Sequence, residues 1–108
     1  MNTIYKFMQE CRTFFVATVD ADQPRVRPFG AVCVYEGKLY ICANNQKKVS
    51  QQIKANPKIE ISAVAADGRW LRLSAQAYAD DGLFEVYYLA NATGTICSFD
   101  GSNEVHTF

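Results

Sequence analysis

The sequence has no excess of charge of either sign: eleven lysines and arginines balance eleven aspartates and glutamates among 108 residues. A chain without net charge has no overall field that would attract nucleic acid or an anionic membrane. Any anion that it binds must be held by a local group of basic side chains. Hydrophobic residues make up 49% of the chain and charged residues 20%. This composition excludes a disordered protein, and the length predicts a single domain over residues 1–108.

Long apolar segments and paired cysteines are also missing. No apolar run reaches the ~18 residues that a membrane-spanning helix needs, and the first residues lack the basic and apolar blocks of a signal peptide. The four cysteines, Cys11, Cys33, Cys42 and Cys97, form no C-x-x-C pair. Their even number leaves disulfides open, but the pattern favours reduced thiols that fill core positions. We therefore expect a cytoplasmic protein.

The motifs of several enzyme classes are absent as well. The chain has no G-x-G-x-x-G, no G-K-S/T and no H-E-x-x-H segment. Its single histidine, His106, lies near the C-terminal end, so we expect neither a metal site nor a Ser-His-Asp triad. If the protein is an enzyme, a cofactor must supply the reactive atoms.

Hydrophobic periodicity predicts mainly strands. A short amphipathic helix comes first, because Ile4, Phe7, Met8 and Cys11 recur at helical spacing, with Asn2 or Thr3 as its N-cap. A second short helix is predicted over 49–54. Strand-like patterns cover 13–19, 25–35, 38–43, 58–65, 69–78, 83–89 and 95–99.

Breaks in these patterns set the expected topology. Pro28 and Gly30 indicate an edge position or a bulge in the second strand, residues 91–94 precede the last strand, and a polar tail begins at 100–103. Six or seven short strands with hairpin turns and two small helices predict a closed or partly closed antiparallel barrel. A sandwich is the alternative. A parallel α/β sheet is excluded, because only one connection is long enough to hold a crossover helix.

The basic residues form the most informative pattern. Arg25 and Arg27 alternate on the second strand, so both guanidinium groups face the same side. Lys47 and Lys48 stand where a strand passes into a helix N-terminus, whose free N–H groups favour an anion. Arginine offers a fork to a phosphate and lysine adds a mobile charge. These residues predict a phosphate site.

Aromatic side chains accompany this pattern. Phe29 follows the arginines on their face, and the strand over 69–78 places Trp70 and Arg72 on the face opposite Leu71 and Leu73. Phe29 and Trp70 are flat apolar surfaces that would cover a heterocycle. A phosphate-binding site next to flat aromatic side chains suits a nucleotide-like ligand.

Each of these features also has a purely structural interpretation. Arg25 and Arg27 would then be a solvated strand face paired with Asp20 and Asp22. The lysines would be an ordinary exposed helix start. Trp70 would be a core or interface residue.

Three stretches carry a resemblance to a known family: PRVRPFGAV at 24–32, EGKLYICANNQKK at 36–48 and WLRL at 70–73. With the opening helix and FFVATV at 14–19, their order is similar to that in the FMN-binding split-barrel proteins, the pyridoxamine 5'-phosphate oxidase-like family. The chain resembles the short, nitroimidazole-resistance-type branch over nearly its whole length. The resemblance implies a mainly β, antiparallel split barrel with an N-terminal helix and one short helix after the third strand.

The resemblance also implies a homodimer with two FMN molecules at the subunit interface. Arg27, with Arg25 beside it, would hold the phosphate together with the two lysines, and Trp70 and Arg72 would complete the site of the partner subunit. The backbone of residues 29–31 and 42–44 would line the isoalloxazine and ribityl chain. The cofactor contacts implied are Arg25, Arg27, Pro28, Phe29, Gly30, Cys42, Ala43, Asn44, Lys47, Lys48, Trp70 and Arg72.

This sequence departs from the family pattern in two places, which limits the family properties that we expect of it. Members have a helical segment where this chain has only residues 79–82, and the oxidase itself has a polar amide at the position of Trp70. We therefore do not expect oxidation of pyridoxamine phosphate.

Two functions of different class follow. One is a flavin oxidoreductase that passes a hydride or electrons between bound FMN and a small molecule. The other is a non-catalytic flavin-binding or sensing dimer. An oligonucleotide-binding barrel is a third interpretation, and the zero net charge argues against it. The sequence identifies neither the substrate nor the electron donor.

Overall fold

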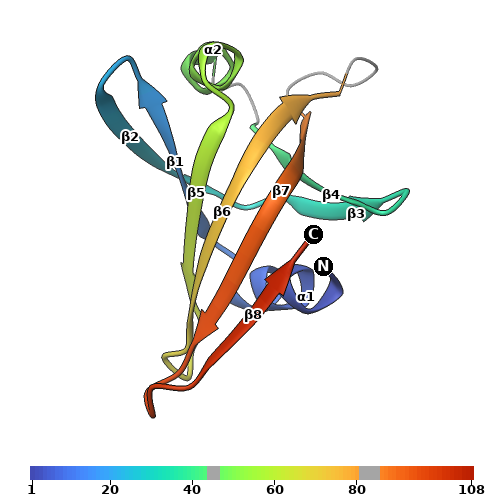
Figure 1. Ribbon diagram of the computed structural model, residues 1–108, viewed down its shortest axis with the longest axis vertical. Coiled ribbons are helices and arrows are strands. Elements are labelled where there is room, and N and C mark those ends of the chain that lie inside the picture. Colours follow the sequence, from blue (N-terminus) through green and yellow to red (C-terminus); the bar gives the residue numbers. More distant parts are fainter. Residues whose placement is uncertain (44–46, 81–85) are drawn as a thin grey trace.

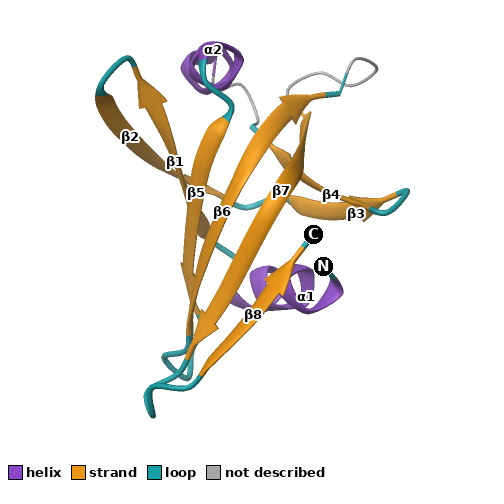
Figure 2. Cartoon of the chain, viewed as in Figure 1, coloured by secondary structure: helices purple, strands orange, loops and turns teal. Residues whose placement is uncertain are grey.

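The computed structural model describes residues 1–43, 47–80 and 86–108. They form two helices, each followed by four strands (Figures 1 and 2). In chain order they are α1 (Asn2–Cys11), β1 (Phe14–Asp20), β2 (Gln23–Phe29), β3 (Val32–Tyr35), β4 (Lys38–Cys42), α2 (Lys47–Ala55), β5 (Lys58–Val64), β6 (Trp70–Ala79), β7 (Val86–Cys97) and β8 (Asn103–Thr107).

The strands form one antiparallel sheet in the order β2-β1-β5-β6-β7-β4-β3, and β8 pairs with the far part of β7. Its two ends, β2 and β3, are consecutive in the chain but do not pair with each other. The barrel is therefore open, and β2–β1 and β4–β3 diverge on either side of it (Figure 1). The predicted antiparallel split barrel is confirmed, and the sandwich alternative is wrong because all strands belong to one sheet.

The core lies between the inner face of the sheet and the two helices. Ile4, Phe7 and Met8 of α1 are buried, as are Val49 and Ile53 of α2, which confirms the predicted helix faces. The expected cap of the first helix is wrong: the N-cap residue is Met1, and no side chain caps the helix.

Close packing of α1 on the sheet depends on one glycine. A Cβ atom added at Gly94 of β7 would lie 2.7 Å from the Ile4 Cδ1 atom. Since van der Waals contact between carbon atoms needs about 3.5 Å or more, a larger residue here would force the Ile4 side chain to shift.

The second predicted strand, over 25–35, is two strands in the structure. Residues Gly30 and Ala31 separate β2 from β3, and each of these strands forms one end of the sheet path. The edge position that Pro28 indicated is confirmed. An edge strand tolerates proline because its outward N–H group has no ladder partner.

The C-terminal part differs more from the prediction. The expected break at 91–94 is absent, because β7 continues through it with a bulge: Asn91 adopts φ 52°, and Asn91 and Ala92 together lie opposite Ala75. The expected polar tail contains β8, which pairs with residues 93–97 of β7. Of the predicted strand over 83–89, residues 83–85 lie outside the described part, as do residues 81 and 82 of the shortened segment.

The cysteines do not fill the core as expected. Cys11, Cys42 and Cys97 are half-buried and Cys33 is exposed, and none of the four forms a disulfide. Among the described residues, neither helix is long and apolar enough to cross a membrane.

Candidate anion-binding site

The β1–β2 hairpin fixes where the two arginines lie. Its register pairs Val16 with Arg27 and Thr18 with Arg25. Cross-strand partners share a face of the sheet, and Val16 and Thr18 are fully buried on the inner face. Both arginines therefore lie on the inner edge of the open barrel, on one side as the strand period predicted.

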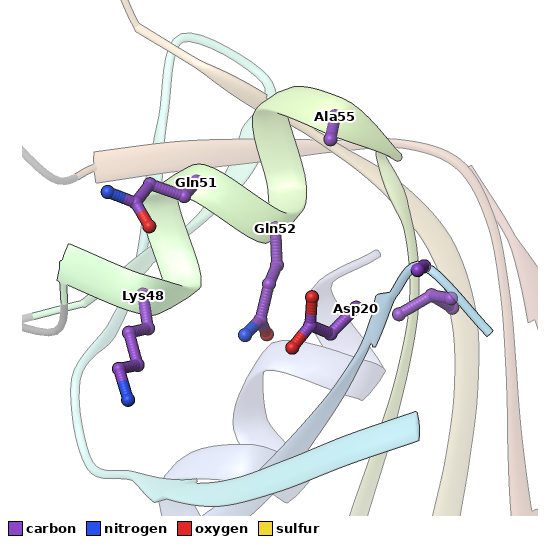
Figure 3. A pocket seen from close by; sticks show the side chains of 7 residues that line it. Asp20, Lys48, Gln51, Gln52 and Ala55 are labelled. Atoms are coloured by element: carbon purple, nitrogen blue, oxygen red, sulfur yellow. The ribbon is translucent and has the colours of Figure 1, made fainter. Parts of the chain in front are cut away.

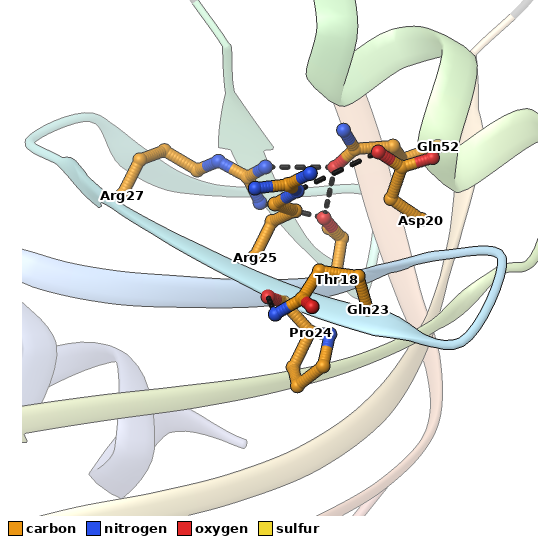
Figure 4. A network of polar contacts seen from close by, with 7 residues as sticks. All are labelled: Thr18, Asp20, Gln23, Pro24, Arg25, Arg27 and Gln52. Atoms are coloured by element: carbon orange, nitrogen blue, oxygen red, sulfur yellow. Dashed lines mark hydrogen bonds and ion pairs between the residues drawn. The ribbon is translucent and has the colours of Figure 1, made fainter.

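Neutral oxygen atoms hold the Arg27 guanidinium in place (Figure 4). Its Nη1 donates to the Val16 carbonyl oxygen at 3.2 Å and to the Thr18 Oγ1 at 2.7 Å. Its Nη2 donates to the Gln52 Oε1 at 2.7 Å. The Thr18 hydroxyl in turn donates to the same Gln52 oxygen, which closes a ring of three side chains. Strand β1 and helix α2 together thus orient this guanidinium.

No carboxylate in the described part of the chain lies within ion-pair distance of Arg27. The side chain is half-buried, and burial, followed by repulsion from Arg25, lowers its pKa. An arginine remains charged in proteins despite such a shift. The result is a fixed positive charge that the described residues do not neutralise.

Arg25 has a different environment. Its Nε lies 3.5 Å from the Asp20 Oδ2, and the two side chains are 55% and 50% exposed. The structural interpretation thus holds in part for Arg25, because it has the predicted acidic partner. An exposed pair of this length contributes little to stability, so phosphate can displace Asp20 at small cost.

A small cavity opens between α2 and the β1–β2 turn (Figure 3). It has a volume of about 250 Å³. Exposed Lys48 and buried Gln52 come from adjacent turns of α2, while Asp20 enters from the β-hairpin. The residues that line it are Val19, Asp20, Ala21, Lys48, Gln51, Gln52 and Ala55.

Arg27, Arg25 and Lys48 converge on this region. Arg27 reaches it through its bond to Gln52, Arg25 through its pair with Asp20, and Lys48 by lining the cavity. The side chain of Lys47, the fourth predicted basic residue, lies outside the described part. These three cations surround a cavity whose lining holds one carboxylate, that of Asp20, and such an excess of positive charge favours an anion.

The predicted backbone contacts adjoin the same corner. The N–H of Cys42 donates to the carbonyl of Ala31 at 3.2 Å, which brings residues 29–31 beside the end of β4. Ala43 is buried next to it, and Asn44 lies outside the described residues.

The side chains of the two residues that follow Arg27 do not extend the basic group. The ring of Phe29 is buried against Phe14, with ring centres 5.9 Å apart, so it cannot cover a heterocycle as expected and only its backbone can contribute. The side chain of Pro28 is exposed on the outer face of β2, opposite Arg27.

Trp70 and Arg72 do not join the basic group within one chain. They lie on the outer face of β6, whereas the arginines of β2 lie on the inner face of the sheet. Trp70 begins β6, at the end of the sheet farthest from α2 (Figure 1). Its ring is 36% exposed and lies under the Arg72 guanidinium at 5.3 Å, so it is not a core residue.

Sequence reasoning missed Thr18 and Gln52, the polar residues that the core buries. Two signals point to them. The hairpin register that follows from a turn at Ala21 and Asp22 places Thr18 opposite Arg25. Gln52 follows Lys48 by four residues, which is one helical turn on the same face.

Comparison with known proteins places the chain in a family. The sequence model of the pyridoxamine 5'-phosphate oxidase family matches residues 2–99. The chain belongs to this family. No curated protein matches the chain.

Solved structures of family members agree in fold. A NimC/NimA family protein from Clostridium acetobutylicum is 43% identical over 100% of this chain and 92% of its own, with a TM-score of 0.90. A second protein from the same organism, related to general stress protein 26 of B. subtilis, is 14% identical with a TM-score of 0.67, and the match covers 100% of this chain and 96% of that one. A pyridoxamine 5'-phosphate oxidase-related, FMN binding protein from Nostoc punctiforme is 10% identical with a TM-score of 0.63, covering 96% and 91%. The last two show the shared fold alone.

Proposed function

We propose that this protein binds FMN and holds its phosphate with Arg25, Arg27 and Lys48, with Lys47 as a further ligand. A phosphate monoester carries close to two negative charges at neutral pH and three acceptor oxygens. Two guanidinium forks and an ammonium group match that charge and geometry. Among the described residues, the donor set therefore fits the cofactor phosphate.

The observation that carries this proposal is the environment of Arg27. A half-buried guanidinium is costly unless a partner compensates its charge. The described residues give Arg27 three neutral acceptors and no carboxylate. Three of its five N–H groups are thus used for orientation, which leaves the Nε–H and the second Nη2–H for an incoming anion.

The rest of the cofactor would extend from the phosphate towards the junction of β2, β3 and β4. The backbone of residues 29–31 and 42–43 lies there in direct contact. The FMN binding protein from Nostoc punctiforme shares the fold. Bound flavin would supply hydride and electron transfer, so the function we propose is that of an oxidoreductase acting on a small molecule.

The same proposal includes a homodimer with the cofactor at its interface. Both described helices cover the inner face of the sheet, while Phe15, Val64, Trp70 and Val105 are exposed on the outer face. A second copy would cover this apolar surface. It would also bring its own Trp70 and Arg72 towards the site that one chain leaves incomplete.

We place the protein in the cytoplasm. None of its four cysteines forms a disulfide, and Cys33 is exposed to solvent. A reducing compartment keeps such thiols unoxidised.

The test of cofactor binding is the absorption spectrum of freshly purified protein, followed by titration of flavin-free protein with FMN. We expect a flavin spectrum or saturable quenching of FMN fluorescence. A colourless protein that leaves FMN fluorescence unchanged at micromolar concentrations would contradict the proposal. Light scattering in the same buffer is expected to give twice the 12.1 kDa chain mass, and Trp70→Glu is expected to lower it.

Turnover is tested separately. Protein-bound FMN is reduced without oxygen, and its reoxidation by small oxidants such as dioxygen is followed by stopped flow. An oxidoreductase is expected to reoxidise faster than free FMN with at least one acceptor. Reoxidation at the rate of free FMN with every acceptor would favour the non-catalytic binding protein.

A further inference from the structure

The amide of Gln52 has an orientation that its neighbours determine. Its Oε1 accepts hydrogen bonds from the Arg27 Nη2 and the Thr18 hydroxyl. Arginine can only donate, and the Thr18 hydroxyl, which accepts from the Arg27 Nη1, still has its own hydrogen to donate to the same amide atom. Two donors that point at one atom require an oxygen there, since an amide nitrogen cannot accept. The Nε2 of Gln52 is therefore the opposite, outward atom of the amide.

This Nε2 has no acceptor among the described residues. The Gln52 side chain is only 9% exposed, and it lines the cavity beside Lys48 (Figure 3). Every enclosed side-chain nitrogen and oxygen of the described residues has a hydrogen-bond partner, so the unpaired Nε2 must be accessible from the cavity, with its two N–H groups open to whatever enters. An acceptor that enters the cavity would satisfy them.

From these contacts we infer that Gln52 is a ligand of the phosphate, donating a hydrogen bond from its Nε2 while its Oε1 holds Arg27. The inference rests on the proposed function and names a residue that the basic pattern did not reveal. Gln52 thus binds the Arg27 guanidinium of β2 and lines the same cavity as Lys48 of α2. The phosphate would contact donors from both elements. Thr18 is a positioning residue that keeps the amide turned towards the cavity.

The test compares FMN with riboflavin, which lacks the phosphate. Gln52→Met removes the amide at similar volume and leaves the net charge unchanged. We expect the Kd for FMN to rise at least about tenfold, the lower end for loss of a hydrogen bond to a charged group, and the Kd for riboflavin to stay the same. Gln51→Met is the matched control, since Gln51 also lines the cavity but is exposed, and it is expected to bind FMN like the parent protein. FMN binding by Gln52→Met at parent affinity would overturn the inference.

A second variant, which is expected to stay folded, makes the test independent of the stability of Gln52→Met. Gln52→Glu keeps an oxygen acceptor for Arg27 and Thr18 but replaces the amide donor by a carboxylate. We expect a melting temperature no lower than that of the parent and a Kd for FMN raised by at least about 100-fold. Unchanged FMN affinity in this folded variant would overturn the inference as well.

A double-mutant cycle separates direct contact from an effect through Arg27. If Gln52 touches the phosphate, Gln52→Met weakens FMN binding further in the Arg27→Met background. If it acts only by orienting Arg27, the second substitution has no effect there, and the direct contact is refuted.

Inorganic phosphate distinguishes failure of this inference from failure of the proposed function. If the parent protein does not bind FMN, its melting temperature is measured with and without phosphate. A rise that Gln52→Met abolishes would support the anion site although the flavin proposal has failed. No rise in the parent protein would contradict both.

Discussion

Arg27 and Arg69 each connect the sheet to a helix, but with opposite chemistry. Arg69 donates to Asp67 at 2.8 Å and to Glu10 of α1 at 3.1 Å, and it lies over the Phe7 ring at 5.1 Å. Arg27 donates to Thr18 and to Gln52 of α2, which are both neutral. The hydrogen bond to Asp67 raises the pKa of Arg69, whereas burial lowers the pKa of Arg27. Arg69 is neutralised by carboxylates of the chain, whereas no carboxylate of the described residues pairs with Arg27, and this difference is our reason for proposing Arg27 as the phosphate ligand.

The largest expected effect comes from removing the unneutralised arginine. Arg27→Ala is expected to raise the Kd for FMN by at least about 100-fold, as for loss of one partner of a buried charged contact. Arg69→Ala removes the same charge from the contact with α1, and it is expected to leave the Kd for FMN within about twofold of the parent value. Fluorescence titration of both variants measures this, and equal losses would erase the distinction between the two arginines.

Lys48 is expected to contribute less, because it is exposed and therefore screened by solvent. Lys48→Ala should raise the Kd for FMN about fivefold. Lys54→Ala is the matched control, since Lys54 lies in the last turn of the same helix. If both variants weaken binding equally, the effect would come from net charge and not from the position at the cavity.

Asp20 is the acidic residue within the site, so its removal is expected to act in the other direction. Asp20→Asn frees Arg25 from its partner and removes a negative charge from the cavity. We expect the Kd for FMN to fall about threefold. Asp22→Asn changes the same net charge two residues away and serves as control. A weaker affinity in Asp20→Asn would show that Asp20 orients Arg25 for the ligand.

The smallest effect concerns the paired arginine. Hydrogen bonds from the backbone and side chain of Arg69 lower the pKa of Asp67. A lowered folded-state pKa stabilises the fold above the unfolded carboxyl pKa, and that contribution is lost as pH falls through the lower folded value. Thermal unfolding of Asp67→Asn should therefore occur slightly below that of the parent at pH 7, and the difference should vanish in acid. A difference that persists at pH 2 would assign it to another cause.

Much of this comparison could be predicted from the sequence. The alternation of Arg25 and Arg27 required both to share a face, and the strand patterns predicted a closed or partly closed antiparallel barrel with two small helices. The bulge at Asn91 and the pairing of β8 were not predictable in the same way. Both depend on partners across the sheet, which local residue preferences do not encode.

The hydrogen-bond partners of Arg27 could not be predicted from the sequence for a similar reason. Gln52 lies twenty-five residues away from it in the chain and meets it only when α2 folds over the hairpin. Acidic neighbours in sequence, Asp20 and Asp22, were the natural candidates for its partner. In the structure, Asp20 pairs with Arg25 instead.

The affinity ratio between FMN and riboflavin tests the central claim most directly, because the two ligands differ only in the phosphate. We predict that the parent protein binds FMN at least about 100-fold more tightly than riboflavin, and that Arg27→Ala brings the two dissociation constants close together. Equal affinities in the parent protein, or a ratio that survives in Arg27→Ala, would contradict the assignment of Arg27 to the phosphate.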